Sequence, residues 1–385
     1  MRWVAKENTE SPCPGLRVDD LPDKIPANVH ILHSQGQLSI LSENVAGVLP
    51  CKNGNEVVIE PKYKGIDPIA LLMYVNSISG IAVNRERIRS GKAEIDLQTI
   101  SDAFVDQLSI IKTEAKKFKR KGYTIQTGAV VGKVNWLKTY RQQHSGKLDS
   151  IVTTVRMSSY DIPENALIAA AAKKIIGFYQ SGSEEFELLF PWAAEADKYH
   201  HSYAELFAFQ SKLNERSLSG PHAYYYPSVM LSKIILGFDS VEIMSEEVDT
   251  ILFNMPGLYE EYIRTGFQRA GGQFGCTIQK GLTPRSFLFY NGECEMIPDI
   301  TIYDGITIKA VLDVKYKIPD SKDYYQIFAY MKYAGLDTAY IISPEVEQDQ
   351  VITAFDGSKV HFVRIDTSSG DELENTAKRI IRDVM

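Results

Sequence analysis

The residue types that could perform chemistry are concentrated between residues 286 and 335. Asp299 follows Pro298 in one β-prone run, and Asp313 and Lys315 stand two positions apart in the next run. Side chains two positions apart in a strand share a face, so the carboxylate and the ammonium group of that pair point the same way. A hairpin that brings Asp299 close to Asp313 would set two carboxylates against each other, and a divalent cation bound by oxygen ligands is the natural compensation. The spacing therefore predicts a Mg²⁺ site.

The predicted site depends on the register of this hairpin. Asp304-Gly305 is a strong turn signal between the two runs. A strict two-residue loop there would pair Asp299 with Ala310 and would place Asp313 on the opposite face of the sheet. A three- or five-residue loop, or a bulge near Pro298, would put both carboxylates on one face. We expect the longer loop or the bulge, because a shared metal ion requires it.

A helix and another strand should follow the hairpin. Asp320 or Ser321 can cap a helix that ends at Gly335, and the run 338–343 is typical of a buried strand. A strand–helix–strand unit implies parallel pairing of its two strands. The helix N-terminus would then lie near the end of the strand that carries Asp313, where it favours an anion such as phosphate.

The rest of the chain is predicted to divide near residue 150. The fold class we expect is α/β: a mixed β-sheet domain preceded by helices over 151–385, and an N-terminal α+β lobe over 1–150. The three tryptophans are expected to pack in the interior. The N-terminal lobe should contain β-strands over 29–59 and helices over 68–79 and 101–121, and the second part should contain a helix over 161–180 and a mainly helical stretch over 184–250.

Composition excludes several classes of protein. The 385 residues include 44% hydrophobic and 24% charged residues, which is ordinary for a globular protein and excludes disorder as the main state. No apolar run approaches the ~20 residues of a membrane span, and the N-terminus lacks a secretory signal, so a cytoplasmic protein is expected. The net charge of −7 makes the chain a poor general binder of nucleic acid. Its four scattered cysteines suit neither structural zinc nor a disulfide framework.

Several motifs together resemble a known family. Pro298-Asp299, Asp313-Val314-Lys315 and Gln326-x-x-x-Tyr330 look like the motifs of the PD-(D/E)xK nuclease fold with its Q-x-x-x-Y helix. The finer resemblance is to the McrC family, the nuclease subunit of GTP-dependent modified-cytosine restriction systems. Four further stretches, in the family's order, carry this resemblance: VVIEPKYKGIDPIALLMYV (57–75), GKVNWLKT (132–139), SSYDIPENALIAAA (158–171) and LYEEY (258–262).

The resemblance implies a DNA endonuclease that uses Mg²⁺, with Mn²⁺ as an alternative ion. Asp299, Asp313 and the backbone carbonyl of Val314 would ligate the metal, which would polarise the scissile phosphate and acidify a water molecule. Lys315 would position that water and offset charge on the phosphorus.

Two other side chains are expected at this site. Gln326 would hold the attacking water or the DNA backbone. By the same resemblance the upstream acid is Glu260, which would orient a water or complete a second metal position, and Glu261 competes for this role.

The chain lacks the G-x-x-x-x-G-K-[ST] motif of nucleotide-binding loops; TGAVVGKV (127–134) has its glycines one position too close. We therefore expect no nucleotide on this chain. The resemblance implies a separate McrB-like AAA+ GTPase hexamer, engaged through the N-terminal lobe, and double-stranded DNA as substrate, with no membrane involved. Two alternatives remain: a stand-alone nuclease of the same fold in DNA repair, and a catalytically silent activator or scaffold of the ring.

Overall fold

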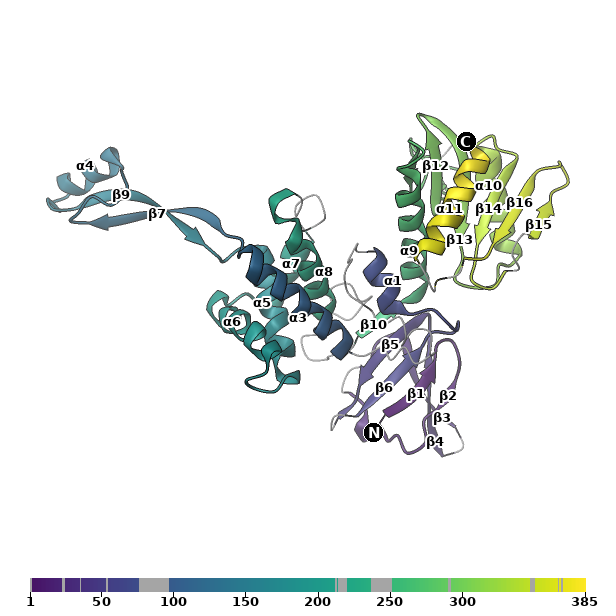
Figure 1. Cartoon of the computed structure of the whole chain (residues 1–385), viewed down its shortest axis with the longest axis horizontal. Helices are drawn as coiled ribbons and strands as arrows, with labels where there is room; N and C mark the ends of the chain where they lie inside the picture. Colours follow the sequence, from purple (N-terminus) through teal and green to yellow (C-terminus); the bar gives the residue numbers. More distant parts are fainter. Residues whose placement is uncertain are drawn as a thin grey trace. The chain divides into compact units, whose positions relative to one another are not determined.

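The computed structural model describes residues 2–22, 25–34, 36–52, 55–75, 97–211, 213, 220–236, 251–289, 292–346, 350–365, 367 and 370–385. The chain forms two compact units (Figure 1). Unit 1 consists of Met1–Leu97 and Asp239–Met385, and unit 2 consists of Gln98–Phe238. Unit 2 is therefore inserted in the sequence of unit 1. For the residues described, no helix is both long and apolar enough to span a bilayer.

The first part of unit 1 is built from two small sheets. Their strand orders are β1-β6-β5-β10 and β2-β4-β3. Aliphatic side chains from both sheets form one buried cluster, which includes Ile40, Leu49 and Ile59. The β-rich pattern predicted for residues 29–59 is thus confirmed. The elements are β1 (Arg2–Lys6), β2 (Ser11–Pro12), η1 (Val18–Asp20), β3 (Val29–Ser34), β4 (Gln37–Ser42), β5 (Val45–Pro50), β6 (Glu56–Glu60), α1 (Pro68–Val75) and β10 (Ile251–Asn254).

The second part of unit 1 is a six-stranded mixed sheet with the order β11-β12-β13-β14-β16-β15. The three central strands β13, β14 and β16 run parallel, and the outer pairings are antiparallel. The elements are α9 (Met255–Gly271), β11 (Thr277–Gln279), β12 (Ile300–Asp304), β13 (Thr307–Val314), α10 (Ser321–Tyr333), β14 (Thr338–Ile342), β15 (Gln350–Thr353), β16 (Lys359–Val363) and α11 (Gly370–Val384). The mixed α/β architecture and the parallel strand–helix–strand unit are confirmed.

Helices cover both faces of this sheet (Figure 1). α10 packs its buried Ile327 and Met331 on the face formed by Val311 and Ile341. α9 and α11 pack against each other so closely that a Cβ on Gly266 would lie 2.3 Å from Leu373. The predicted helix ends hold as well, because Asp320 caps α10 and Gly335 follows it with φ 69°.

Unit 2 combines a helical body with a long ribbon, a three-stranded sheet in which one strand has only two residues. Its elements are α3 (Leu97–Glu114), β7 (Lys119–Thr127), β8 (Lys133–Val134), α4 (Trp136–His144), β9 (Ile151–Ser159), α5 (Pro163–Ile175), η3 (Ile176–Phe178), α6 (Glu184–Tyr199), α7 (Tyr203–Gln210), η5 (Gly220–Tyr225) and α8 (Tyr226–Ile235). Figure 1 shows β7 and β9 as a ribbon with α4 at its end. All nine residues of β7 pair with β9.

The structure corrects several expectations in this region. The chain does not divide at residue 150, because β9 begins at Ile151 and pairs with β7. The helix predicted to run to residue 121 ends at Glu114, since pairing with β9 draws the following lysine-rich residues into β7. The helix predicted over 161–180 is limited to Pro163–Ile175, and Ile162 rather than Asp161 is its N-cap.

Trp136 does not pack in the interior as expected; it is 76% exposed on α4. Residues 76–79 of the predicted first helix and residues 237–250 of the predicted helical stretch lie outside the described part of the chain.

Candidate active site

The hairpin β12–β13 places the two predicted carboxylates on one face of the sheet. Ile302 pairs with Ala310 but Tyr303 pairs with Ile308, so Lys309 is the extra residue of a β-bulge. The predicted bulge is therefore present, although it lies five residues beyond Pro298, and the loop has only the two residues Gly305 and Ile306. The register beyond the bulge pairs Ile300 with Leu312. One step further, Asp299 faces Asp313.

The two carboxyl groups influence each other's ionisation. Asp313 is 1% exposed. Oδ2 of Asp299 accepts a hydrogen bond of 2.8 Å from the backbone N–H of Val314. Burial, followed by the charge of Asp313, raises the pKa of Asp299 to about 7. Burial also raises the pKa of Asp313, while the charge of Lys315 opposes this shift. The two carboxyl groups therefore disfavour each other's charged form, and a cation bound between them would relieve that repulsion.

Lys315 is held by three polar side chains. Its Nζ lies 2.6 Å from Oδ2 of Asp313, 3.1 Å from Oε1 of Gln326 and 3.7 Å from Oδ1 of Asp323. Burial is the largest single influence and lowers the pKa of Lys315, but Asp313, Asp299 and Asp323 together outweigh burial and the pKa is raised. The ammonium group therefore stays charged at neutral pH and is aimed at the carboxylate pair.

The start of α10 fixes this arrangement through Asp323, a residue that the sequence reasoning missed. Asp320 and Asp323 form a capping box, in which Oδ2 of Asp323 accepts the backbone N–H of Asp320 at 2.8 Å. The same Oδ2 lies 2.9 Å from Nζ of Lys317. The spacing of Asp320 and Asp323, three residues apart at a predicted helix start, is the sequence signal that could have indicated this capping box.

Gln326 and Tyr330 lie one turn apart on α10. Nε2 of Gln326 donates to the hydroxyl of Tyr330 at 2.8 Å, while its Oε1 accepts from Lys315. Tyr330 is 8% exposed and belongs to the core under α10. It therefore orients Gln326 as well as packing.

Glu260, on α9, contributes charge to the site. Its carboxylate is less exposed than that of Glu261 (21% against 43%) and contacts Arg264 at 2.8 Å and Lys280 at 2.5 Å. The charge of Glu260 is among the causes that raise the pKa of Asp299. The structure thus joins Asp299 to Glu260 electrostatically, whereas the only ion pair of Glu261 within the described residues is with Arg264, which Glu260 also contacts.

The donor set fits a hard divalent cation with a partial protein shell. Oδ2 of Asp313 is buried and accepts no hydrogen bond of ordinary geometry within the described residues, although the Lys315 ammonium is adjacent. Nowhere in that same part of the chain do three or more His, Cys, Asp or Glu side chains form a metal cluster. Two adjacent carboxylates are donors of the kind that a hard divalent cation takes, and water or phosphate oxygens would have to complete its shell.

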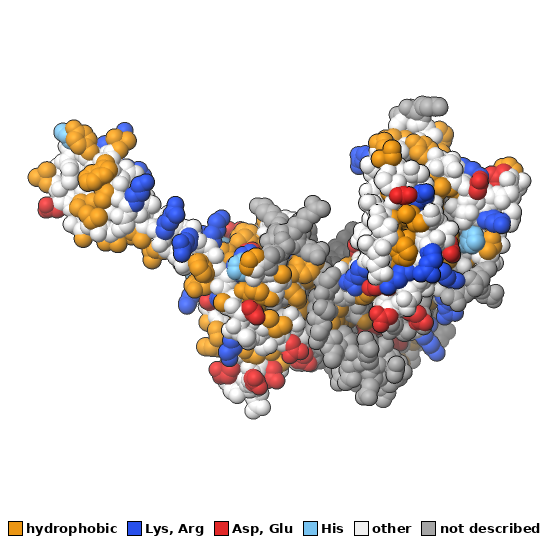
Figure 2. Space-filling model, turned by 45° about the horizontal axis from the view of Figure 1, so that its top comes forward, with side chains coloured by type: hydrophobic (Ala, Val, Ile, Leu, Met, Phe, Trp, Pro, Cys, Tyr) orange, Lys and Arg blue, Asp and Glu red, His pale blue; other side chains and the backbone are white. Residues whose placement is uncertain are grey.

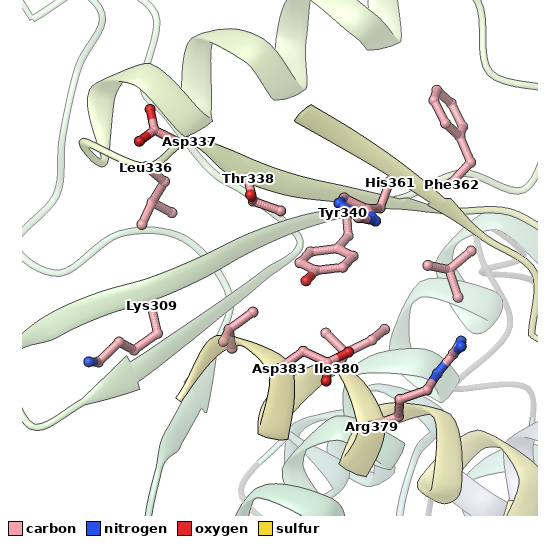
Figure 3. Close-up of a pocket in the computed structure, with 12 residues that line it drawn as sticks. Lys309, Leu336, Asp337, Thr338, Tyr340, His361, Phe362, Arg379, Ile380 and Asp383 are labelled. Atoms are coloured by element: carbon pink, nitrogen blue, oxygen red, sulfur yellow. The ribbon is translucent and has the colours of Figure 1, made fainter. Parts of the chain in front are cut away.

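A cavity of about 510 Å³ in the same sheet lies apart from this site (Figure 3). Tyr340, His361 and Arg379 converge on it from β14, β16 and α11. Ile341 is the residue paired with Asp313. Tyr340, its neighbour in the strand, therefore points to the opposite face, and this cavity does not belong to the carboxylate pair.

Comparisons with known proteins agree with this architecture. The sequence matches the family described as "McrBC 5-methylcytosine restriction system component" over residues 40–344. No curated protein matches it by sequence.

Solved structures from Thermococcus gammatolerans are similar to the chain. One is McrC from a half-complex of a tetradecameric assembly of McrB AAA+ hexamers with bound McrC, at 14% identity and TM-score 0.64, with 100% of both chains covered. The other is the cryo-EM structure of the McrBC complex, at 12% identity and TM-score 0.46, which covers 70% of this chain and 88% of that one. The sequence match extends over most of the chain, and the chain therefore belongs to the McrBC 5-methylcytosine restriction system component family.

Proposed function

We propose that this chain is the Mg²⁺-dependent, DNA-cleaving subunit of an McrBC-like restriction complex. The observation that carries the proposal is the meeting of Asp299, Asp313, Lys315 and Gln326 at the end of one hairpin. Paired acids, an adjacent ammonium and an amide are the groups that phosphodiester hydrolysis requires. Membership in the restriction-component family supports DNA as the substrate.

The residues of the chain have distinct roles in this proposal. A divalent ion held by Asp299, Asp313 and the Val314 carbonyl would polarise the scissile phosphate and lower the pKa of the attacking water. Lys315, held charged by Asp313, stabilises negative charge that develops on the phosphate. Gln326, oriented by Tyr330, holds the attacking water by accepting a hydrogen bond from it, or contacts the DNA backbone.

We further propose that the ribbon of unit 2 engages an AAA+ ring partner. Nine paired residues at ~3.3 Å each make a ribbon of roughly 30 Å. Its end carries large apolar side chains in contact with solvent (Figure 2), which a monomeric protein rarely leaves in one patch. These side chains, which we call the apolar tip, are Val130, Val131, Trp136, Leu137, Tyr140 and Leu148.

The family and the solved McrB–McrC assembly support such a partner. The apolar tip lies within residues 1–150, where the resemblance implies the ring-binding lobe. A narrow ribbon with an apolar end is suited to entering a ring. The partner gathers DNA and hydrolyses nucleotide, and this chain cuts.

Cleavage by the reconstituted complex tests the proposal. The chain, its ring partner, GTP, Mg²⁺ and methylated plasmid should yield linear DNA. Asp313→Asn and Lys315→Ala should abolish cleavage while leaving complex mass and GTP hydrolysis unchanged. Asp304→Asn, an exposed acid of the same hairpin, is the matched control and should cut normally. Wild-type cutting rates in both site variants would overturn the proposal, whereas GTP stimulation without any cleavage by the native chain would favour a silent activator.

A further inference from the structure

A cleft lies at the same edge of the six-stranded sheet as Lys315. The parallel strands β13, β14 and β16 end together, and ligands of α/β sheets bind at the carboxyl ends of such strands. Lys315 follows β13, and Arg364 follows β16. Between the ends of β14 and β16 and the loop after β6 lies a cleft of about 810 Å³, whose lining includes Lys62, Lys64 and Arg364.

The loop that forms one wall of the cleft is tied to the catalytic strand. Glu7 is fully buried, and its Oε2 accepts the backbone N–H of Lys62 and the hydroxyl of Tyr316, each at 3.0 Å. Nζ of Lys62 lies 4.6 Å from the ring centroid of Tyr316, and the ring of Tyr63 meets that of Tyr316 edge-on at 4.9 Å. Tyr316 follows Lys315 directly and packs on Tyr259 of α9, with ring centroids 5.6 Å apart, so the wall is fixed to the end of the strand that carries the proposed site.

The cleft carries a local positive surplus in an acidic chain. Three of its lining residues are cationic and two, Glu345 and Glu372, are acidic. Lys64 and Arg364 are exposed, and neither forms an ion pair with any described residue. Lys62 is half-buried over its aromatic partners and feels the charge of Glu345. Lys64 and Arg364 are therefore the cations presented to solvent.

We propose that this cleft holds the sugar–phosphate backbone of the DNA duplex on one side of the cut, with Lys64 and Arg364 as phosphate-contacting residues. The inference rests on the proposed function, because it takes the phosphodiester at Lys315 as its starting point. A DNA strand whose scissile phosphate lies at Lys315 and which runs along the carboxyl edge of the sheet would pass the end of β16, where Arg364 and Lys64 line the cleft. Phosphate contacts supply affinity and register without reading sequence.

Duplex binding by the full chain tests the cleft without cleavage. Fluorescence anisotropy of a short labelled duplex is measured in EDTA for Lys64→Glu and Arg364→Glu. The control is Lys359→Glu, because Lys359 is an exposed residue at the opposite end of β16 from Arg364. Like the cleft variants, it changes the net charge of the chain from −7 to −9. Each cleft variant should bind roughly tenfold more weakly and should reduce the slope of log K against log salt by about 1, and the control should stay within about twofold. Lys64→Arg should retain binding.

Several outcomes would overturn this assignment. They are an equal loss in Lys359→Glu, unchanged affinity in both cleft variants, or no duplex binding by the native chain at low salt. Cleavage kinetics of the complex separate the two proposals. If the cleft variants raise KM and keep kcat, both proposals stand. If the native chain cleaves DNA and both cleft variants keep its KM, the cleft assignment alone is wrong. If the cleft variants bind DNA more weakly but the native chain never cleaves it, the nuclease proposal alone is wrong.

Discussion

Asp299 reaches across the hairpin to the backbone of Val314, whose N–H it accepts at 2.8 Å. Val314 lies between the two residues that face the site, Asp313 and Lys315. Its side chain is buried on the other face of the sheet. The hydrogen bond therefore fixes the carboxylate of Asp299 against the strand end, where the charge of Asp313 acts on it.

This geometry predicts a pH-dependent effect of Mg²⁺ on thermal stability. Because the pKa of Asp299 is raised to about 7, the proton competes with the metal below that pH and is lost above it. Mg²⁺ should raise the melting temperature of the chain more at about pH 8 than at about pH 6. Asp299→Asn keeps the bond to Val314 and should lose most of the shift. Scanning fluorimetry measures it, and an equal shift at both pH values would contradict the site.

Glu260 and Glu261 should differ in their effect on cleavage. The charge of Glu260 acts on Asp299, while the more exposed Glu261 is paired with Arg264 alone. We expect Glu260→Gln to slow single-turnover cleavage at least ~10-fold, in the range typical of acid–base or water-positioning groups, and Glu261→Gln to change it less than about twofold. The reverse order would move the upstream acid to Glu261.

Asp323 should matter for cleavage, and Asp320 for stability alone. Either Asp→Ala change removes half of the capping box, which should cost about 1 kcal/mol in the free energy of unfolding. Only Asp323→Ala also removes an anion 3.7 Å from Nζ of Lys315. Denaturant unfolding should therefore show similar losses, while the cleavage rate should fall in Asp323→Ala and hold in Asp320→Ala. Equal rates in the two variants would show that Asp323 acts only as a cap.

Glu7 should make the stability of unit 1 fall with rising pH. Burial raises the pKa of Glu7 above its ordinary value of 4.5, so the folded state binds the proton more tightly than the unfolded state. The stability contributed by this group is present below pH 4.5 and is lost as pH rises through the folded pKa. Glu7→Gln retains an acceptor for Lys62 and Tyr316. Its free energy of unfolding should therefore rise relative to that of the native chain as pH increases. The exposed Glu10→Gln is the control; parallel stability curves for Glu7→Gln and the native chain would refute the expectation.

The sequence could reveal the site chemistry because alternation within one strand is local. Asp313 and Lys315 share a face in any straight strand, and only the bulge at Lys309, set by the pairing of two strands, decides where Asp299 lies. Glu7 gives no local signal, since its partner Tyr316 is 309 positions away.

The ribbon of unit 2 was misread for a related reason. Lysines are favourable at a helix end, so the run after Glu114 was interpreted as helix. Pairing with β9, which begins 24 residues after β7 ends, overrides that local preference. Because of the same nonlocal pairing, α4 lies at the end of the ribbon and not in a core, and Trp136 is exposed.

The apolar tip predicts separable binding and folding. Trp136 and Leu137 are 76% and 62% exposed, so changing both to Ser should alter the free energy of unfolding by no more than about 0.5 kcal/mol each. If the tip engages a ring, the double variant should lose stimulation of GTP hydrolysis and co-elution with the partner. Its Mg²⁺-induced thermal shift should persist, because that shift arises in unit 1. Ile306→Ser, at a 97% exposed position in unit 1, controls for lost surface hydrophobicity. Normal stimulation by the double variant would assign ring binding to another surface of the chain.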